Sequence, residues 1–184
     1  MNIVKHLFAL GILVSPIAAA QADDSSPQDS TVAATDAAHG QVQVTYTNPD
    51  KFLDASPQRG YGGKQRDETL RKLQRHMESQ GARYLKPGQT LKIEVLDLDL
   101  AGRVEWWNSN AYDVRIMRDI DSPSMKVRYS LEENGAAVSS GEEWISDHSY
   151  LMGINSLGNS DSLKYEKTML NDWFRNRFGK TAHG

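Results

Sequence analysis

The alternation of apolar and polar residues is most regular between Gly88 and Gly102, in the segment G-Q-T-L-K-I-E-V-L-D-L-D-L-A-G. Up to Val95 the apolar residues occupy odd positions, which is the period-2 pattern of a half-buried strand. Beyond Val95 leucines occupy even positions, and Asp97 and Asp99 take the odd ones. A regular strand would turn both aspartates into the core, at a cost of several kcal/mol. The pattern therefore predicts a central strand with a β-bulge near Val95-Leu96, or a switch of sheet face, that turns both aspartates outward.

A hairpin is predicted farther along the chain by the dipeptide Asn134-Gly135. Both residues tolerate the positive φ of a type I′ turn, and alternating strands flank them. The spacing from the turn puts Glu142 on the apolar face, which indicates a local irregularity near Gly141. The same spacing gives the register, with Leu131 opposite Val138, Lys126 opposite Glu143 and Met125 opposite Trp144.

Two segments have the apolar periodicity of helices. Gln65–Gln80 has a narrow apolar stripe and a basic face that includes His76, so it should lie on a sheet with its basic side in solvent. Asp161–Phe178 has a broad, aromatic stripe, with Asn159 or Ser160 as its N-cap. Alternation adds strands at 42–46 and 112–117. The order β-α-β-β-β-β-α predicts an α+β fold, in which two helices pack on a mainly antiparallel, twisted sheet of about five strands.

The first 40 residues differ in composition from the rest. Residues 1–22 have the features of a cleavable signal peptide, with a basic residue, a short apolar run and the small-x-small site Ala20-Gln21-Ala22. Residues 23–40 are rich in Ser, Ala, Thr, Gln and Asp, which predicts a flexible leader. The chain has no cysteine, which fits a bacterial periplasm. We therefore expect a periplasmic protein with one α+β domain over residues 41–180.

Charge narrows the range of partners. Without Lys5 the mature chain has 20 basic and 24 acidic residues, and the four extra acids lie in the leader, so the chain from residue 37 onward is balanced at 20 against 20. A balanced domain has no general electrostatic attraction to nucleic acid or anionic lipid. No later segment has the ~20 apolar residues of a membrane-spanning helix. We expect neither a nucleic-acid partner nor a transmembrane segment.

The sequence lacks the motifs of the common hydrolases. It contains no H-E-x-x-H, G-x-S-x-G, P-loop or G-x-G-x-x-G motif, and the absence of cysteine excludes a thiol enzyme. Only His76 and His148 lie in the predicted domain. His148, beside Asp147, is either a candidate general base or an ordinary surface histidine. No cofactor is implied.

The carboxylates allow two hypotheses. Asp97 and Asp99 could share a hard cation such as Ca²⁺ or Mg²⁺, or they are solvent-facing residues of a bulged strand. Together with Glu142 or His148 they could instead serve a hydrolase acting on an envelope glycan, which requires these groups to converge in one cleft.

Trp106 and Trp107 lie in the polar loop after the central strand. Exposed loop aromatics stack on sugar rings or anchor partner proteins. Adjacent residues usually point opposite ways, so we expect one ring in the core and one at the surface. The hypothesis that follows is a non-catalytic periplasmic protein that binds an envelope protein or glycan through Trp106 and Trp107.

Four runs of residues resemble a known family. They are Asn48-Pro49-x-x-Phe52-x-Asp54, then Leu91-Lys92-Ile93-Glu94-Val95-x-Asp97-x-Asp99-Leu100-Ala101-Gly102, then Ser140-Gly141-Glu142-Glu143, and last Ser160-Asp161-x-Leu163-x-Tyr165-Glu166-Lys167-x-Met169-Leu170-x-Asp172-Trp173-Phe174. Together they resemble the domain of unknown function 3016 family, exported proteins of proteobacteria, over residues 42–178. The resemblance implies a signal peptide, one small α+β domain and no assigned activity. In the last run we expect Glu166 and Asp172 to pair with sheet arginines such as Arg115 or Arg128.

Overall fold

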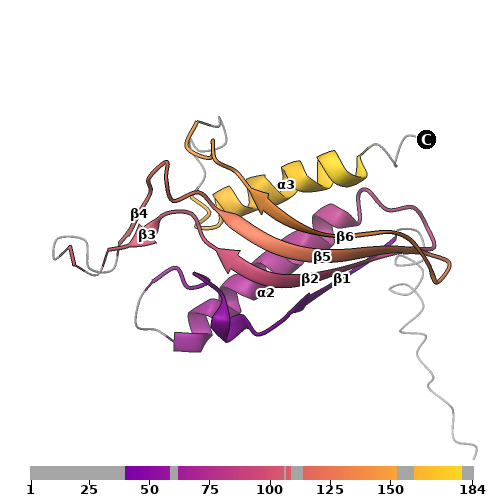
Figure 1. Ribbon diagram of the computed structural model, residues 1–184, viewed down its shortest axis with the longest axis horizontal. Coiled ribbons are helices and arrows are strands. Elements are labelled where there is room, and N and C mark those ends of the chain that lie inside the picture. The colour runs from indigo at the N-terminus through magenta and orange to yellow at the C-terminus, as the bar shows by residue number, and fades with distance from the viewer. Residues whose placement is uncertain (1–39, 59–61, 106, 109–113, 153–159, 180–184) are drawn as a thin grey trace, which may run out of the picture.

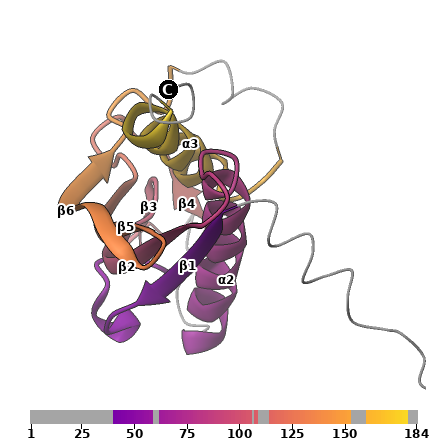
Figure 2. The same cartoon turned by 90° about the vertical axis from the view of Figure 1, so that its right-hand side faces the viewer.

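The computed structural model describes residues 40–58, 62–105, 107–108, 114–152 and 160–179, so the predicted signal peptide and most of the leader lie outside the described residues. One four-stranded sheet has the order β1-β2-β5-β6, two helices pack on one of its faces, and β3 and β4 form a separate small sheet (Figure 1, Figure 2). The predicted α+β class is confirmed. The elements are β1 (Gln41–Tyr46), η1 (Pro49–Lys51), α2 (Gly62–Gly81), β2 (Gln89–Asp99), β3 (Arg103–Val104), β4 (Arg115–Ile116), β5 (Ser124–Glu133), β6 (Ala136–Ser146) and α3 (Lys164–Phe178).

Strands β1 and β2 are parallel, because helix α2 connects them as a crossover, whereas the β2–β5 and β5–β6 pairs are antiparallel. The apolar stripe of α2 is buried as its spacing predicts, with Leu73 and Met77 fully inaccessible to solvent. The helix ends at Gly81, where an added Cβ would lie 2.7 Å from Val42 Cγ2. Glycine therefore lets the end of α2 approach β1 closely.

The predicted bulge in the central strand is confirmed. Val95 lies opposite Val127 and Asp97 lies opposite Lys126, so Leu96 is the extra residue. Leu98 and Leu100 are buried, as the bulge requires, while Leu96 itself remains partly exposed. The strand thus keeps its apolar face on the core despite the shift in the sequence pattern.

The hairpin turn is also confirmed, since Asn134 has φ 50° and Gly135 has φ 83°. The predicted register is wrong by one residue: Leu131 lies opposite Ser139, because Val138 is an extra residue next to the turn. Glu142 therefore faces outward, opposite Arg128, and the irregularity lies at Val138 rather than Gly141. The same shift places Lys126 opposite Trp144 and Met125 opposite Ile145.

The strand predicted at 112–117 is much shorter in the described part of the chain. Residues 112–113 lie outside the described part, and of the described residues 114–117 only Arg115–Ile116 pairs. Its partner is Arg103–Val104 rather than a strand of the large sheet. Gly102, with φ 71°, has no room for a side chain, since an added Cβ would lie 2.5 Å from the carbonyl oxygen of Ile116. This close contact brings β4 against the turn that follows β2.

Helix α3 begins at Lys164, three residues later than predicted, and its N-cap position is Leu163 without a side-chain cap. The carboxylate of Asp161 instead accepts the backbone N–H of Leu163 at 2.9 Å. The predicted cap by Ser160 is therefore wrong, and Asn159 lies outside the described residues. The predicted aromatic stripe is buried, and each such side chain contributes about 1.5–3 kcal/mol. Its members are Leu163, Met169, Leu170, Trp173, Phe174 and Phe178.

Candidate functional site

The topology brings three loop regions to one end of the large sheet, namely the β1–α2, β2–β5 and β6–α3 connections. Because β1 and β2 are parallel and β5 runs antiparallel to both β2 and β6, the chain leaves β1, β2 and β6, and enters β5, at the same end. We call the described parts of these loops the loop end. It comprises residues 47–58, 100–105, 107–108, 114–123 and 148–152.

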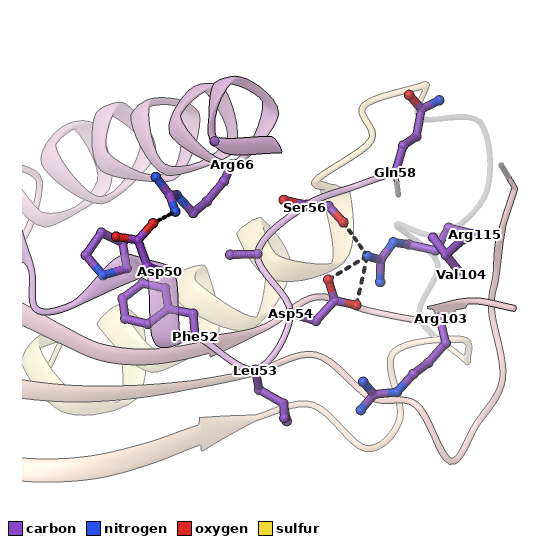
Figure 3. Close-up of a pocket in the computed structure, with 13 residues that line it drawn as sticks. Asp50, Phe52, Leu53, Asp54, Ser56, Gln58, Arg66, Arg103, Val104 and Arg115 are labelled. Carbon is purple, nitrogen blue, oxygen red and sulfur yellow. Dashed lines mark hydrogen bonds and ion pairs between the residues drawn. The ribbon is translucent and has the colours of Figure 1, made fainter. Parts of the chain in front are cut away.

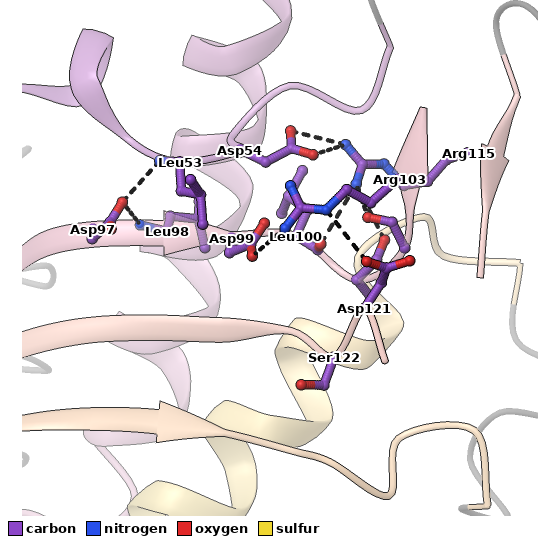
Figure 4. A network of polar contacts seen from close by, with 12 residues as sticks. Leu53, Asp54, Asp97, Leu98, Asp99, Leu100, Arg103, Arg115, Asp121 and Ser122 are labelled. Carbon is purple, nitrogen blue, oxygen red and sulfur yellow. Dashed lines mark hydrogen bonds and ion pairs between the residues drawn. The ribbon is translucent and has the colours of Figure 1, made fainter. Parts of the chain in front are cut away.

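Asp97 and Asp99 fasten two of these loops to the central strand (Figure 4). One carboxylate oxygen of Asp97 accepts the backbone N–H of Leu53 at 2.9 Å and that of Leu98 at 2.8 Å. Asp99 pairs with Arg103 at 3.0 Å. Burial raises the pKa of the Asp99 carboxyl, and the charge of Arg103 opposes this shift. Both side chains therefore have structural partners, which a bound cation would have to share.

No group of three or more His, Asp or Glu side chains in the described part of the chain has an arrangement that could hold a metal ion. The cation hypothesis at Asp97 and Asp99 would thus need water or backbone oxygens to complete the coordination shell. It stays a prediction.

Arg115 connects three segments of the loop end (Figure 3). Its guanidinium donates to both carboxylate oxygens of Asp54, at 3.0 and 2.9 Å, and to the carbonyl oxygens of Ser56 at 2.8 Å and Gly102 at 2.7 Å. Its side chain is only 11% exposed. The planar guanidinium suits this role because its N–H donors diverge toward several acceptors at once. Arg115 thereby ties β4 to the 54–57 loop and to the turn after β2.

Glu166 is the most deeply buried carboxyl group of the described residues, at 2% exposure. One of its oxygens accepts the backbone N–H of Ala101 at 2.8 Å, and the other has no hydrogen-bond partner among the described residues. Burial raises the pKa of this carboxyl. Glu166 therefore joins the start of α3 to the turn after β2.

The predicted pairing of the α3 acids with sheet arginines is wrong. Glu166 binds a backbone N–H, and Asp172 pairs with Arg175 on its own helix at 2.6 Å. Arg128 pairs with Glu94 at 2.7 Å and Glu142 at 2.9 Å on the outer face of the sheet. The sheet carboxylates are nearer to Arg128 and already face it across the strands.

A pocket of about 530 Å³ opens at the loop end beside the start of α2 (Figure 3). Three arginines line it, and each is paired: Arg66 with Asp50 and Asp67, Arg115 with Asp54, and Arg103 with Asp99 and Asp121. The charges of these arginines are therefore compensated by aspartates, so the pocket is not a strong anion site. Its remaining walls are largely apolar, formed by Pro49, Phe52, Leu53, Ala55 and Val104.

Exposed apolar side chains also lie on the loops of this end, and one of them, Leu53, lines the pocket. Trp107 is 64% exposed and Ile120 is 80% exposed, so both side chains extend well into solvent. Trp106 lies outside the described residues, so the expected division of the tryptophan pair between core and surface remains a prediction. The other exposed large apolar residues of the loop end are Leu53, Val114, Leu151 and Met152.

The other carboxylate and histidine candidates each have partners of their own. Glu142 faces outward and pairs with Lys126 at 2.7 Å, whereas Glu143 faces α3 and accepts the indole N–H of Trp173 at 3.0 Å. His148 contacts the hydroxyl oxygens of Ser122 and Ser146, at 3.1 and 3.2 Å. Neighbouring residues on a strand alternate between its faces, so Glu142 and Glu143 cannot serve one cleft.

His76 is part of a helix–helix contact. Its Nε2 lies 2.9 Å from the side-chain oxygen of Asn171 and 3.2 Å from the carbonyl oxygen of Lys167, both on α3. Burial lowers the pKa of this imidazole. The prediction that His76 belongs to the solvated basic face of α2 is therefore wrong.

The contacts that organise the loop end could not be found by spacing. Asp54 and Arg115 are 61 residues apart, and Ala101 and Glu166 are 65 apart. The sequence did contain one indication that these residues matter to the fold. Asp54, Ala101 and Glu166 all lie in the runs that carry the family resemblance.

Comparison with known proteins agrees with that resemblance. No curated protein matches the chain. The described helices include none that is long and apolar enough to cross a membrane. A family profile described as "Protein of unknown function (DUF3016)" matches residues 40–176, which is most of the chain and includes every described strand. The chain therefore belongs to the DUF3016 family.

Proposed function

We propose that this protein is a non-catalytic, periplasmic binding module that recognises an envelope protein or another envelope component through the loop end. The single observation that carries the proposal is the gathering of exposed apolar side chains there. Of the eight exposed large apolar residues in the described part of the chain, six lie on the three loop regions of this end. Single exposed apolar residues are ordinary, but apolar residues gathered at one place are typical of interaction sites.

The ion pairs beneath these loops support the same proposal. Arg115 with Asp54, Arg103 with Asp121, and Arg118 with Glu105 each join loop segments to one another. Loops held in place before binding lose less conformational entropy when a partner docks. The exposed Trp107 would then serve as an anchor, since tryptophan is enriched among residues that dominate binding energy.

Photo-crosslinking in the native envelope tests this proposal. A photoreactive amino acid placed at position 107 or 120 should give a discrete adduct with one partner. The matched control is position 138, because Val138 is also exposed and apolar but lies next to the hairpin at the other end of the sheet. No adduct from either loop position, or the same adducts from all three, would contradict the proposal.

Two alternatives have separate tests. A cation module at Asp97 and Asp99 requires Ca²⁺ or Mg²⁺ to raise the melting temperature, and this shift must be lost in Asp97→Asn. A glycan hydrolase requires cleavage of envelope glycan that is abolished in Glu142→Gln or Asp99→Asn. The partners of these carboxylates favour the binding module, because Glu142 and Asp99 are each engaged by cationic side chains.

A further inference from the structure

Strand β6 is a long edge strand that is poorly protected against pairing. It pairs with β5 on one side and with no described strand on the other. Its eleven residues include no Lys, Arg or Pro, and its only charges are Glu142 and Glu143. Natural edge strands of this length usually carry such residues or are covered. The bulge at Val138 interrupts only the part next to the hairpin.

The free backbone groups of β6 can be assigned from one hydrogen bond. The N–H of Asp147 donates to the carbonyl oxygen of Pro123 at 3.3 Å, one step beyond the Ser146–Ser124 pair. In an antiparallel pair, residues alternate between bonding to the partner strand and pointing away from it. Ile145 therefore bonds to β5, while Trp144 and Ser146 direct their N–H and C=O groups to the outer edge.

A groove of about 460 Å³ runs along this part of the edge, between β6 and α3, which lie side by side (Figure 1). Five consecutive residues of the strand region, 143–147, form one wall, and one face of α3 forms the other. Ile145, Met169 and Trp173 contribute nearly buried apolar atoms to it. A strand edge flanked by a helix is the geometry in which an extended peptide adds to a sheet as a further strand.

The charges along the groove select among extended partners. Glu143, Asp147 and Asp172 line it together with one cationic residue, Arg177, so three acids stand against one base and the lining has a net charge of −2. Glu143 pairs with Arg177 and Asp172 pairs with Arg175, so Asp147 is the acid of this lining that has no ion pair with a described residue. A peptide with basic side chains is complementary to this lining. A second copy of the chain is disfavoured, because symmetric pairing through β6 would bring the same acidic lining from each copy together.

We propose that the β6–α3 groove binds an extended, basic segment of a partner protein, which pairs with the backbone of Trp144 and Ser146 as a fifth strand of the sheet. This site is distinct from the pocket and apolar side chains of the loop end. Backbone pairing would supply most of the affinity, and the acidic side chains would select the sequence.

Selection from a displayed library of linear peptides on the full chain tests the proposal, followed by titration of a selected synthetic peptide. Ser146→Pro removes the outward N–H without removing a donor to β5, and proline is tolerated at sheet edges. Ser146→Ala is the matched control, because it loses the same hydroxyl but keeps the N–H. We expect Ser146→Pro to weaken binding at least about tenfold, with Ser146→Ala and Trp107→Ser binding as the wild type does.

Hydrogen exchange gives a readout that does not depend on a variant. Adding the peptide to the wild-type chain should slow exchange of the Trp144 and Ser146 amides. Failure to select basic peptides, equal binding by the Pro and Ala variants, or unchanged exchange at both amides would overturn the proposal. A dimer detected by light scattering that Ser146→Pro dissociates would also overturn it, because a second copy would then occupy the edge.

Discussion

Arg115 holds together segments of the loop end that are remote in sequence. We expect Arg115→Ala to lower the free energy of unfolding by about 3–5 kcal/mol, because removing one member of a buried pair leaves Asp54 and several carbonyl oxygens without a partner. Urea unfolding followed by circular dichroism measures this loss.

Arg71→Ala is the control for that experiment. Arg71 pairs with Glu68 at 2.7 Å on the exposed side of α2, where solvent screens such pairs and they contribute little to stability. Similar small losses in both variants would show that the Arg115 contacts do not stabilise the loop end.

Glu166 makes a second prediction at the scale of single residues, concerning pH. Burial raises the pKa of its carboxyl in the folded state, so above the ordinary glutamate pKa of about 4.3 the unfolded chain releases this proton more readily than the folded one. The stabilising effect of the protonated group is therefore complete at low pH and is lost as pH rises through the folded pKa.

Replacement by glutamine isolates this effect. Glu166→Gln keeps an acceptor for the Ala101 N–H but cannot ionise. We expect the variant to gain stability relative to the wild type as pH rises from the ordinary glutamate pKa of about 4.3 through the folded pKa of Glu166, measured by urea unfolding across pH. Asp99 shifts in the same direction, so the quantity to compare is the difference between the two proteins at each pH. A difference that does not change with pH would contradict the prediction.

At the scale of elements, one bulge could be predicted and the other could not. In β2 the shifted alternation would have buried Asp97 and Asp99, so the sequence itself required an extra residue. In β6 the run Ala136-Ala137-Val138-Ser139-Ser140 has small side chains on both faces, and such strands specify register weakly. Gly141, which we expected to be irregular, instead lies against the ring of Tyr129, 3.1 Å from an added Cβ.

The bulge in β2 gives a prediction about deletions. Removing Leu96 joins Val95 directly to Asp97. Their partners on β5 are Val127 for Val95 and Lys126 for Asp97, and these two residues are already consecutive. The ladder would then be regular, and Leu98 and Leu100 would keep their inward positions. We expect the Leu96 deletion to fold and to melt cooperatively in circular dichroism.

Deletion of Lys92, in the same strand, is the matched control. It shifts one part of β2 by a residue and turns its apolar side chains to the solvent face, so we expect it not to fold. If the Leu96 deletion is as damaging as the Lys92 deletion, the bulge does more than correct the register.

At the scale of the whole molecule, the periodicity of the sequence was sufficient to predict the α+β class and the two helices. It was not sufficient to predict which strands pair with one another. The parallel pairing of β1 with β2 depends on α2 crossing over the sheet, and β3 with β4 form a sheet of their own. These partners are set by long-range contacts, which alternation within a segment does not encode. The same limit applies to Asp54 and Arg115, whose contact joins two loops.

Export is a prediction about the whole chain. Expression of the full sequence in a Gram-negative host should give a periplasmic protein whose first residue is Asp23, because cleavage is expected after Ala20-Gln21-Ala22. Cell fractionation and intact-mass spectrometry measure both properties. Ala22→Arg should leave the longer precursor, since the position before the cut requires a small residue. A cytoplasmic, unprocessed wild-type chain would contradict the prediction.

The direction of the chain through the fold also determines how the domain can be attached to anything else. Strand β1 starts at the end of the sheet opposite the loop end, and α3 runs toward that same end, from Glu166 near Ala101 to Phe174 stacked on Tyr84 (Figure 1). The start of β1 and the end of α3 thus both lie at the end of the molecule opposite the loop end. A linker, tag or immobilising surface joined before β1 or after α3 is therefore attached at the end of the molecule opposite Trp107. The loop end stays accessible in either case.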